Sequence, residues 1–253
     1  VDKIELSKLI GKKITKIKRR SKFLIFEIGK TYRLLAHLGM TGKFFFTDNK
    51  DNKFKTSFYY LLNYKKDQKH DRVTFVLNNK QKLIYNDVRK FGFIKIYSSN
   101  SITKSQHLTH LGPEPLEKNW NFSYLKKYVY RRERSIKNIL MDQKCVSGLG
   151  NIYVNEILFL SKIKPIRPAT KLKNFEIEKI IKFSKKILKN SIKLGGSTIK
   201  DFSSENGKKG DFQQHFKVYG RENQDCSNID CNLRIIKTVM SNRATFFCKK
   251  CQK

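Results

Sequence analysis

The chain has 253 residues, enough to bury one large hydrophobic core or two modest ones. Its 55 Lys and Arg residues against 21 Asp and Glu give a formal net charge of +34, which indicates a polyanionic partner, with nucleic acid as the leading candidate. No stretch approaches the roughly 20 apolar residues of a membrane-spanning helix, and nothing resembles a signal peptide. Four of the five cysteines lie in the last 28 residues, a pattern typical of metal binding and not of a disulfide framework, so we expect a cytoplasmic protein.

Short runs rich in isoleucine, phenylalanine, tyrosine and valine occupy residues 13–97, and they predict the strands of an antiparallel sheet assembly. The clearest runs are residues 23–28, 72–77 and 91–97. Residues 48–69 are polar and lysine-rich, which predicts a long hairpin excursion. Residues 111–116 contain two prolines and a glycine between unlike halves of the chain, so they mark the expected domain boundary.

Arg89 and Phe91 lie two residues apart, so on a strand both side chains would project to the same side. When a base is flipped out of duplex DNA, it leaves a void and an unpaired partner base, which a guanidinium and a ring suit in shape and hydrogen bonding. The other interpretation is that the pair has no functional role, with the arginine on the surface of the sheet and the phenylalanine in its core.

After the boundary, the apolar residues take up a helical spacing, which predicts a helical second domain. The predicted helices cover residues 121–132, 136–142, 152–161 and 175–194. Gly195 and Gly196 are expected to cap the last helix at its C-terminus. The polar residues 203–210 that follow predict a mobile loop.

A glycine-rich turn at residues 148–150 links two of these helices, and Asn151 is placed to cap the second one. Helix N-termini bind phosphate groups, although an asparagine cap more commonly has only a structural role. The basic run at residues 131–134 favours phosphate binding, but a charge run is also typical of a solvated helix face.

Four of the five cysteines lie near the C-terminus in two close pairs. We expect Cys226, Cys231, Cys248 and Cys251 to hold one structural zinc ion, with no open position for a catalytic water. The alternative is four reduced cysteines that pack as small hydrophobic residues, for which this segment has few apolar partners. Cys145 stands alone, and we expect it to be buried and inert.

Several different motifs follow one another along the chain, at residues 20–24, 37–42, 69–71, 87–92, 111–116, 148–153, 195–198, 218–221 and 243–246. Residues 37–42, for example, read His-Leu-Gly-Met-Thr-Gly, and residues 148–153 read Gly-Leu-Gly-Asn-Ile-Tyr. In this order, and with the cysteines, the motifs resemble those of the bacterial formamidopyrimidine-DNA glycosylases, relatives of the endonuclease VIII enzymes. The resemblance covers nearly the whole chain.

This resemblance implies an α+β fold, in which an antiparallel β-sandwich domain precedes a helical domain with a helix-two-turn-helix motif and a C-terminal zinc-finger hairpin. The corresponding boundaries are residues 1–112, 113–212 and 213–253. It implies a monomer associated with the nucleoid, which binds double-stranded DNA between its domains. The implied activity is that of a bifunctional DNA glycosylase and AP lyase of base-excision repair, which flips oxidised purines out of the duplex and uses Schiff-base chemistry and β,δ-elimination.

The resemblance also assigns roles to residues. Met40, Arg89 and Phe91 would fill the space left by the flipped base, with Arg89 facing the orphaned cytosine. Lys22, Asn151 and Arg243 would gather on flanking phosphates, and Lys22 and Arg243 would assist catalysis. Residues 198–212 would form a loop that closes over the flipped base. Further DNA contacts are implied for His70, Arg132, Thr198, Lys200 and Tyr219.

The family mechanism also needs an N-terminal proline nucleophile followed by a glutamate, whereas the sequence begins Val1-Asp2-Lys3. We therefore expect a fragment that is inactive as given, because an internal amide nitrogen is not a nucleophile. Val88 stands where the family usually has proline, and Lys90 replaces a second arginine.

Two other functions remain open from the sequence. One is a relative that has lost catalysis and only recognises lesion-bearing or distorted duplex. The other is a basic zinc-ribbon protein that binds structured RNA, such as that of the ribosome. Within the enzyme interpretation, Arg89 with Phe91 and the long loop after Thr198 favour oxidised purines over oxidised pyrimidines.

Overall fold

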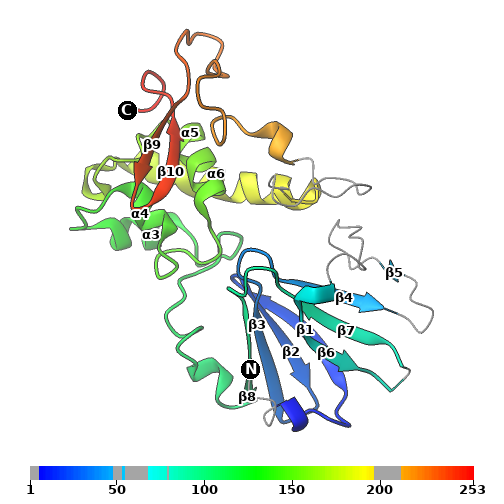
Figure 1. The fold of residues 1–253 in the computed structure, drawn as a ribbon. Coiled ribbons are helices and arrows are strands. Elements are labelled where there is room, and N and C mark those ends of the chain that lie inside the picture. Colours follow the sequence, from blue (N-terminus) through cyan, green and yellow to red (C-terminus); the bar gives the residue numbers. More distant parts are fainter. Residues whose placement is uncertain (1–5, 48–52, 55–67, 79, 197–211) are drawn as a thin grey trace. The chain divides into compact units, whose positions relative to one another are not determined.

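The computed structural model describes residues 6–47, 53–54, 68–78, 80–196 and 212–253. These residues form two compact units, and the chain passes from the first to the second at Thr109 and His110 (Figure 1). Most of the predicted hairpin at residues 48–69 lies outside the described residues, as does all but the last residue of the predicted loop at 198–212, including Thr198 and Lys200.

The first unit consists of two antiparallel sheets that share one hydrophobic core. One sheet has the strand order β1 (Ile14–Arg20), β2 (Phe23–Ile28), β3 (Tyr32–His37) and β8 (Phe93–Ser98). The other has the order β5 (Lys53–Phe54), β4 (Lys43–Thr47), β7 (Lys82–Asn86) and β6 (Asp71–Val76). The ring of Phe26 on β2 lies 5.2 Å from the ring of Phe44 on β4, so the sheets pack face to face. This arrangement is the predicted β-sandwich.

The second unit is helical, with a core in which Trp120 is fully buried and donates from Nε1 to Ser184 Oγ at 2.8 Å. Its helices are α3 (Phe122–Val129), α4 (Ile136–Met141), α5 (Asn151–Leu160) and α6 (Asn174–Lys193). As predicted, α6 ends at glycines, since Gly195 and Gly196 have φ of 76° and 88°, and Gly196 N donates to Ser191 O at 2.8 Å. None of the described helices is both long and apolar enough to cross a membrane.

A two-stranded hairpin follows the helices within the same compact unit. It consists of β9 (Ile236–Met240) and β10 (Arg243–Phe247), joined by Ser241 and Asn242 with φ of 47° and 56°. Two positive φ values in a two-residue connection match the twist of the paired strands, and asparagine tolerates this conformation well.

Helix α5 is shared by two hydrophobic cores. Leu158 belongs to the core of the helical unit, whereas Phe159 packs with Val218, Ile235 and Phe246 around the cysteines. A helix that is apolar on all sides is typical of a buried position. The hairpin therefore takes one wall of its core from α5.

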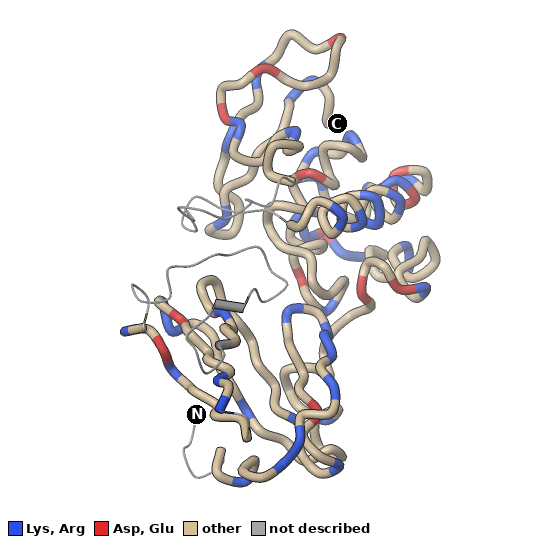
Figure 2. Tube along the Cα trace, turned by 90° about the vertical axis from the view of Figure 1, so that its right-hand side faces the viewer, with Lys and Arg blue, Asp and Glu red and all other residues tan. Residues whose placement is uncertain are grey.

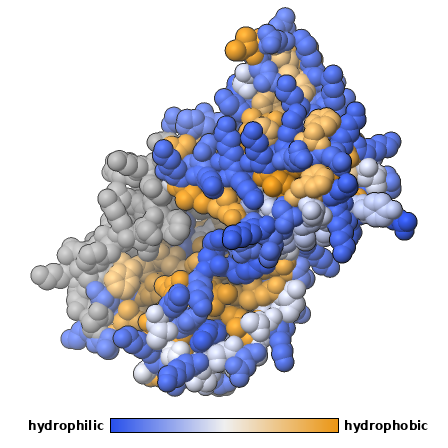
Figure 3. Space-filling view, turned by 180° about the vertical axis from the view of Figure 1, so that it is seen from behind, coloured by the Kyte–Doolittle hydropathy of each residue, from blue (hydrophilic) through white to orange (hydrophobic). Residues whose placement is uncertain are grey.

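Lysine and arginine residues are spread over both units, and aspartate and glutamate residues are few (Figure 2). In the space-filling view most of the surface is hydrophilic, with hydrophobic residues exposed in patches on the strand-rich unit (Figure 3). The positive charge is thus a general property of the described surface, and it does not by itself locate a site.

Candidate nucleic-acid interface and metal centre

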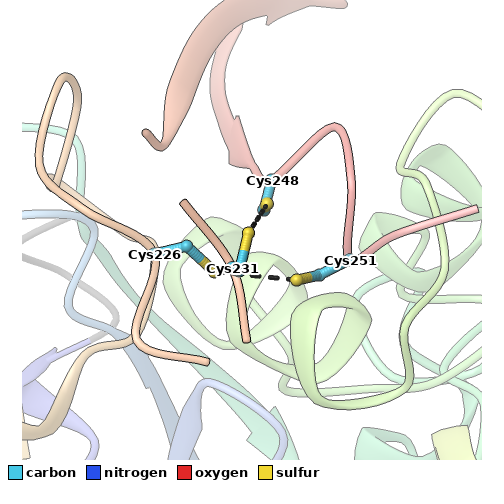
Figure 4. Close-up of side chains that lie close together, drawn as sticks. All are labelled: Cys226, Cys231, Cys248 and Cys251. Carbon is cyan, nitrogen blue, oxygen red and sulfur yellow. Dashed lines mark hydrogen bonds between the residues drawn. The ribbon is translucent and has the colours of Figure 1, made fainter. Parts of the chain in front are cut away.

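The four C-terminal cysteines converge on one point. Cys226 Sγ lies 3.8 Å from Cys251 Sγ, and Cys231 Sγ lies 3.5 Å from Cys248 Sγ (Figure 4). All four sulfur atoms lie within 4.8 Å of one another. Zinc–sulfur bonds of about 2.3 Å in a tetrahedron require sulfur atoms about 3.8 Å apart, so the spacing fits such an ion. The cluster can hold a metal ion.

Hydrogen bonds of the backbone also help to position these cysteines. Cys226 N donates to Leu233 O at 3.0 Å. Cys248 N donates to Gln252 Oε1 at 2.9 Å, and the buried Gln252 side chain donates in turn to Ile163 O at 2.8 Å. The cluster is therefore anchored both to the hairpin and to the segment that follows α5.

Two helices hold strand β10 by hydrogen bonds. Lys137 on α4 donates from Nζ to Ala244 O at 3.0 Å and to Thr245 Oγ1 at 2.6 Å. Asn151 on α5 donates from Nδ2 to Ala244 O at 2.9 Å. Arg243, the residue before Ala244, is exposed at the start of β10. The structure thus places Asn151 against the residue that follows Arg243.

The prediction that Asn151 caps α5 is wrong. The N-cap is Gly150, with φ −130° and ψ 178°, and Asn151 is the first helical residue. Because the Asn151 side chain reaches across to β10, it is not turned back to the helix N-terminus. It connects the start of α5 to the hairpin.

A cationic cavity of about 380 Å³ opens beside this junction. Arg134, Lys137 and Arg243 contribute its basic side chains. Asp142 also lines it, but this carboxylate is paired with Arg134 at 3.1 Å. Burial, with Arg243 nearby, lowers the pKa of Lys137 from its ordinary value of 10.5 to about 8. The cavity therefore has the charge to accept an anion.

In the first unit, three of the predicted DNA-contacting side chains form one exposed cluster. Arg89 Nη1 donates to Met40 Sδ at 3.2 Å, and Arg89 Cζ lies 4.7 Å from the centre of the Phe91 ring. Met40 is 55% exposed and Phe91 is 59% exposed, so both apolar side chains are accessible to a partner beside the arginine. We call Met40, Arg89 and Phe91 the wedge cluster.

The wedge cluster does not lie on a strand, contrary to the prediction. Arg89 and Phe91 belong to the turn between β7 and β8, and β8 begins only at Phe93. Lys90 between them has φ of 59°, which interrupts any extended conformation. The two side chains nevertheless meet, because the turn folds Arg89 over the ring of Phe91.

The remaining predicted residues lie at several places. Lys22 is exposed in the turn between β1 and β2, and His70 is half-buried beside Arg72, with 3.5 Å between His70 Nδ1 and Arg72 Nη2. Arg132 is exposed, and its guanidinium lies 4.3 Å above the ring of Tyr128. Lys22, His70 and the wedge cluster belong to the first unit, and Asn151, Arg243 and Arg132 to the second.

Tyr219 is positioned by a carboxylate that we did not predict. Glu156 on α5 is buried and accepts hydrogen bonds from the backbone N–H groups of Lys217 and Tyr219 at 2.8 Å and of Val218 at 3.0 Å. The Tyr219 ring packs at 5.1 Å from that of Phe246. Cys145 is buried as predicted, and burial raises the pKa of its thiol to about 12, so it stays protonated.

Sequence reasoning also missed Lys137 and Asp87, which hold other site residues in place. Lys137 carries a weak signal, since a lysine next to Ile136 on a short apolar helix is placed near the buried face. Asp87 is part of a recognised motif, but its partners cannot be read from that motif.

An antiparallel sandwich, a helix-two-turn-helix segment and a four-cysteine hairpin, in this order, define the class of DNA glycosylases that carry a C-terminal cysteine finger. The family model described as the formamidopyrimidine-DNA glycosylase N-terminal domain matches residues 2–94, and that of the formamidopyrimidine-DNA glycosylase H2TH domain matches residues 111–203. The chain belongs to the formamidopyrimidine-DNA glycosylase family.

Relatives and solved structures agree with this assignment. A formamidopyrimidine-DNA glycosylase of Rickettsia felis is 39% identical over 97% of this chain and 83% of its own length, and one of Roseobacter denitrificans is 36% identical over 98% and 85%. A Lactococcus lactis FPG mutant in complex with DNA containing Fapy-dG superposes with a TM-score of 0.84 at 35% identity, covering 99% of this chain and 86% of that one. MutM in complex with DNA containing carbocyclic 8-oxo-G gives 0.81 at 35% identity, with the same coverage.

Proposed function

We propose that this protein removes oxidised purines from duplex DNA as a bifunctional DNA glycosylase and AP lyase. The observation that carries the proposal is the wedge cluster, in which two exposed apolar side chains flank an arginine. The solved relatives point to the same substrates, because their complexes contain Fapy-dG or 8-oxo-G in DNA.

The wedge cluster suits base flipping. A base extruded from the stack leaves an apolar gap and a partner base without hydrogen bonds. Met40 and Phe91 would fill the gap with apolar surface, and Arg89 would present fixed donors to the orphaned cytosine. Exposure of these side chains in the free protein is then explained by the DNA that covers them in the complex.

The cationic residues suit phosphate binding. We assign Asn151, Arg243 and Lys22 to phosphates near the lesion, with Lys22 and Arg243 stabilising the charge that develops on the leaving phosphate during strand cleavage. His70, Arg132 and Tyr219 would add contacts to the backbone. Thr198 and Lys200, outside the described residues, would belong to the loop over the flipped base.

The cysteine cluster suits zinc, and Cys226, Cys231, Cys248 and Cys251 would hold the ion. Four thiolates fill a tetrahedral zinc site, so the ion supplies a structural cross-link and no activated water. The cross-link would keep β10 in place and with it Arg243 beside Asn151. The division of the chain at residues 112 and 212 is proposed on the same family pattern.

Strand cleavage in this proposal proceeds through a Schiff base. A secondary amine at the chain start attacks the sugar C1′, the base leaves, and elimination follows on both sides of the vacated nucleoside. The proline that supplies this amine, and the glutamate after it, are not among the residues of the sequence, which begins Val1-Asp2-Lys3. The test therefore uses a protein that carries this proline as its free N-terminus.

The test is borohydride trapping on a duplex with one oxidised guanine opposite cytosine, with an undamaged duplex as the control. Covalent capture on the lesion duplex alone supports the proposal. Preferential binding without capture supports a relative that recognises lesions but lacks catalysis. Binding that structured RNA competes away as well as lesion duplex does would contradict a lesion-specific function.

A further inference from the structure

One buried carboxylate joins the two turns that carry the wedge cluster. Asp87 is 1% exposed and lies at the start of the turn that bears Arg89 and Phe91. Its Oδ1 accepts from Thr41 Oγ1 at 2.5 Å, and Thr41 directly follows Met40 in the other turn. Its Oδ2 accepts from Gly92 N at 2.9 Å, directly after Phe91. The Asp87 side chain thus accepts hydrogen bonds from Thr41, which follows Met40, and from Gly92, which follows Phe91.

Thr41 completes the connection. While its hydroxyl donates to Asp87, the same Oγ1 accepts from Arg89 N at 3.0 Å. The Thr41 hydroxyl therefore links the backbone of Arg89 to the residue that follows Met40, and the carboxylate fixes the orientation of that hydroxyl. Only an acceptor without hydrogen atoms can receive both the Thr41 hydroxyl and the Gly92 amide in this way.

The two turns are also packed backbone to backbone. A Cβ added to Gly39, whose φ is +60°, would lie 2.7 Å from Gly92 N. A Cβ added to Gly92 would lie 2.5 Å from His37 O. Neither glycine has room for a Cβ, so the relative position of the turns depends on direct backbone contact and on the hydrogen bonds to Asp87, including one from the Tyr85 hydroxyl at 3.3 Å.

The carboxylate is charged in this place. Burial alone would raise the pKa of Asp87, but the hydrogen bonds from Thr41, Gly92 and Tyr85 outweigh burial and lower it. A cation also faces this turn from β6: Arg72 donates from Nε to the backbone oxygen of Asp87 at 3.0 Å. A charged acceptor forms stronger hydrogen bonds than a neutral one.

We propose that Asp87 is a positioning residue that assembles the wedge cluster before DNA binds. Met40, Arg89 and Phe91 then meet the duplex at a fixed spacing, so that their insertion requires little further ordering of the two turns. The inference rests on the proposed function of the wedge cluster and adds the residue that sets its geometry. Asp87 itself does not touch DNA.

The experiment compares three variants of the full gene product with the wild type. Asp87→Asn removes an acceptor and the charge, and Thr41→Val removes the hydroxyl link while it keeps the side-chain shape. Glu27→Gln is the matched control, because it also removes one carboxylate charge in the same unit, at a side chain on β2 that pairs with Lys18 on β1.

The probes are a duplex with a tetrahydrofuran abasic analogue opposite cytosine, the same duplex with adenine opposite, and an undamaged duplex. A 2-aminopurine beside the analogue reports unstacking by its fluorescence. We expect Asp87→Asn and Thr41→Val to lose at least tenfold in affinity for the abasic duplex, to slow the 2-aminopurine rise and to discriminate less between cytosine and adenine. Affinity for undamaged duplex should change less than threefold in all three variants.

The inference is overturned if Asp87→Asn and Thr41→Val unstack 2-aminopurine and discriminate the opposite base as the wild type does. It is also overturned if Glu27→Gln loses as much, since the loss would then follow from any missing carboxylate charge in this unit. Wild type that binds abasic and undamaged duplex equally well contradicts the proposed function itself, which is a separate and recognisable result.

Discussion

The side chain of Lys137 is buried although it ends in an ammonium group. Its pKa is lowered by burial and by Arg243 to about 8, whereas in the unfolded chain it has its ordinary value of 10.5. Between these values the unfolded chain holds a proton that the folded chain has released, so folding stability should increase with pH across this window. Below about pH 8 the folded state carries the full penalty.

We expect Lys137→Met to flatten this dependence. The free energy of unfolding, measured with urea at pH values between 8 and 10, should rise less steeply in the variant than in the wild type. Lys182→Met, at an exposed position of α6, serves as the control and should keep the wild-type slope. Equal slopes in all three proteins would show that Lys137 does not titrate in this range.

Glu156 is a second ionisable residue inside the protein, and burial raises the pKa of its carboxyl group. Because its two oxygens accept three backbone N–H groups, Glu156→Gln would place an amide NH₂ against one of these donors. An unsatisfied buried group of this kind costs about 1–3 kcal/mol, so the free energy of unfolding, measured with urea, should be lower in the variant by that amount. The exposed Glu178→Gln on α6 should be indistinguishable from wild type. A matching loss in both variants would refute a special role for Glu156.

At the scale of elements, the cysteine hairpin depends on more than its own residues. We expect a chelator that removes the metal to release β10 and to reduce affinity for lesion duplex at least tenfold. Far-UV circular dichroism should change little, because the core of α3 to α6 is separate from the cysteine cluster. Metal content measured by mass spectrometry should fall in Cys248→Ser and stay at one ion per chain in Cys145→Ala. Equal metal content in both variants would contradict the assignment.

Elements with a regular period could be predicted from the sequence, and connections could not. The run at residues 23–28 is strand β2, and the helical spacing at 175–194 is matched by α6 with a shift of one residue at each end. The turn at residues 87–92 was misread as part of a strand, because a lysine with positive φ leaves no trace in the pattern. The cysteine cluster was predictable, since the spacing of its ligands is local.

The residues that hold the site together could not be predicted for a related reason. Glu156 and Lys137 bind backbone groups that are 61 or more positions away in the chain, and backbone groups carry no sequence identity. Asp87 binds Thr41 across 46 positions. Only the fold reveals such pairs. The side chains expected to touch DNA were easier to propose, because their motifs recur in the family.

At the scale of the whole molecule, the net charge of +34 predicts affinity for DNA that depends strongly on salt. Each lost phosphate contact should reduce the slope of log K against log salt concentration by about 1. We expect Arg243→Gln to do so on undamaged duplex, as measured by fluorescence anisotropy. Lys182→Gln removes the same charge on α6 and should leave the slope unchanged. Equal reductions would mean that general charge, and not a defined contact, sets the affinity.

The sharing of α5 between two cores has a consequence for how this protein can be taken apart. A zinc finger that folds alone can be cut out and attached elsewhere, but this hairpin would leave behind Phe159, which closes its core. Excised with its four cysteines, the peptide could still bind metal, yet it would lack one wall against which Phe246 packs. The hairpin is therefore not a portable module: it can be exchanged between relatives only together with the helix on which it rests.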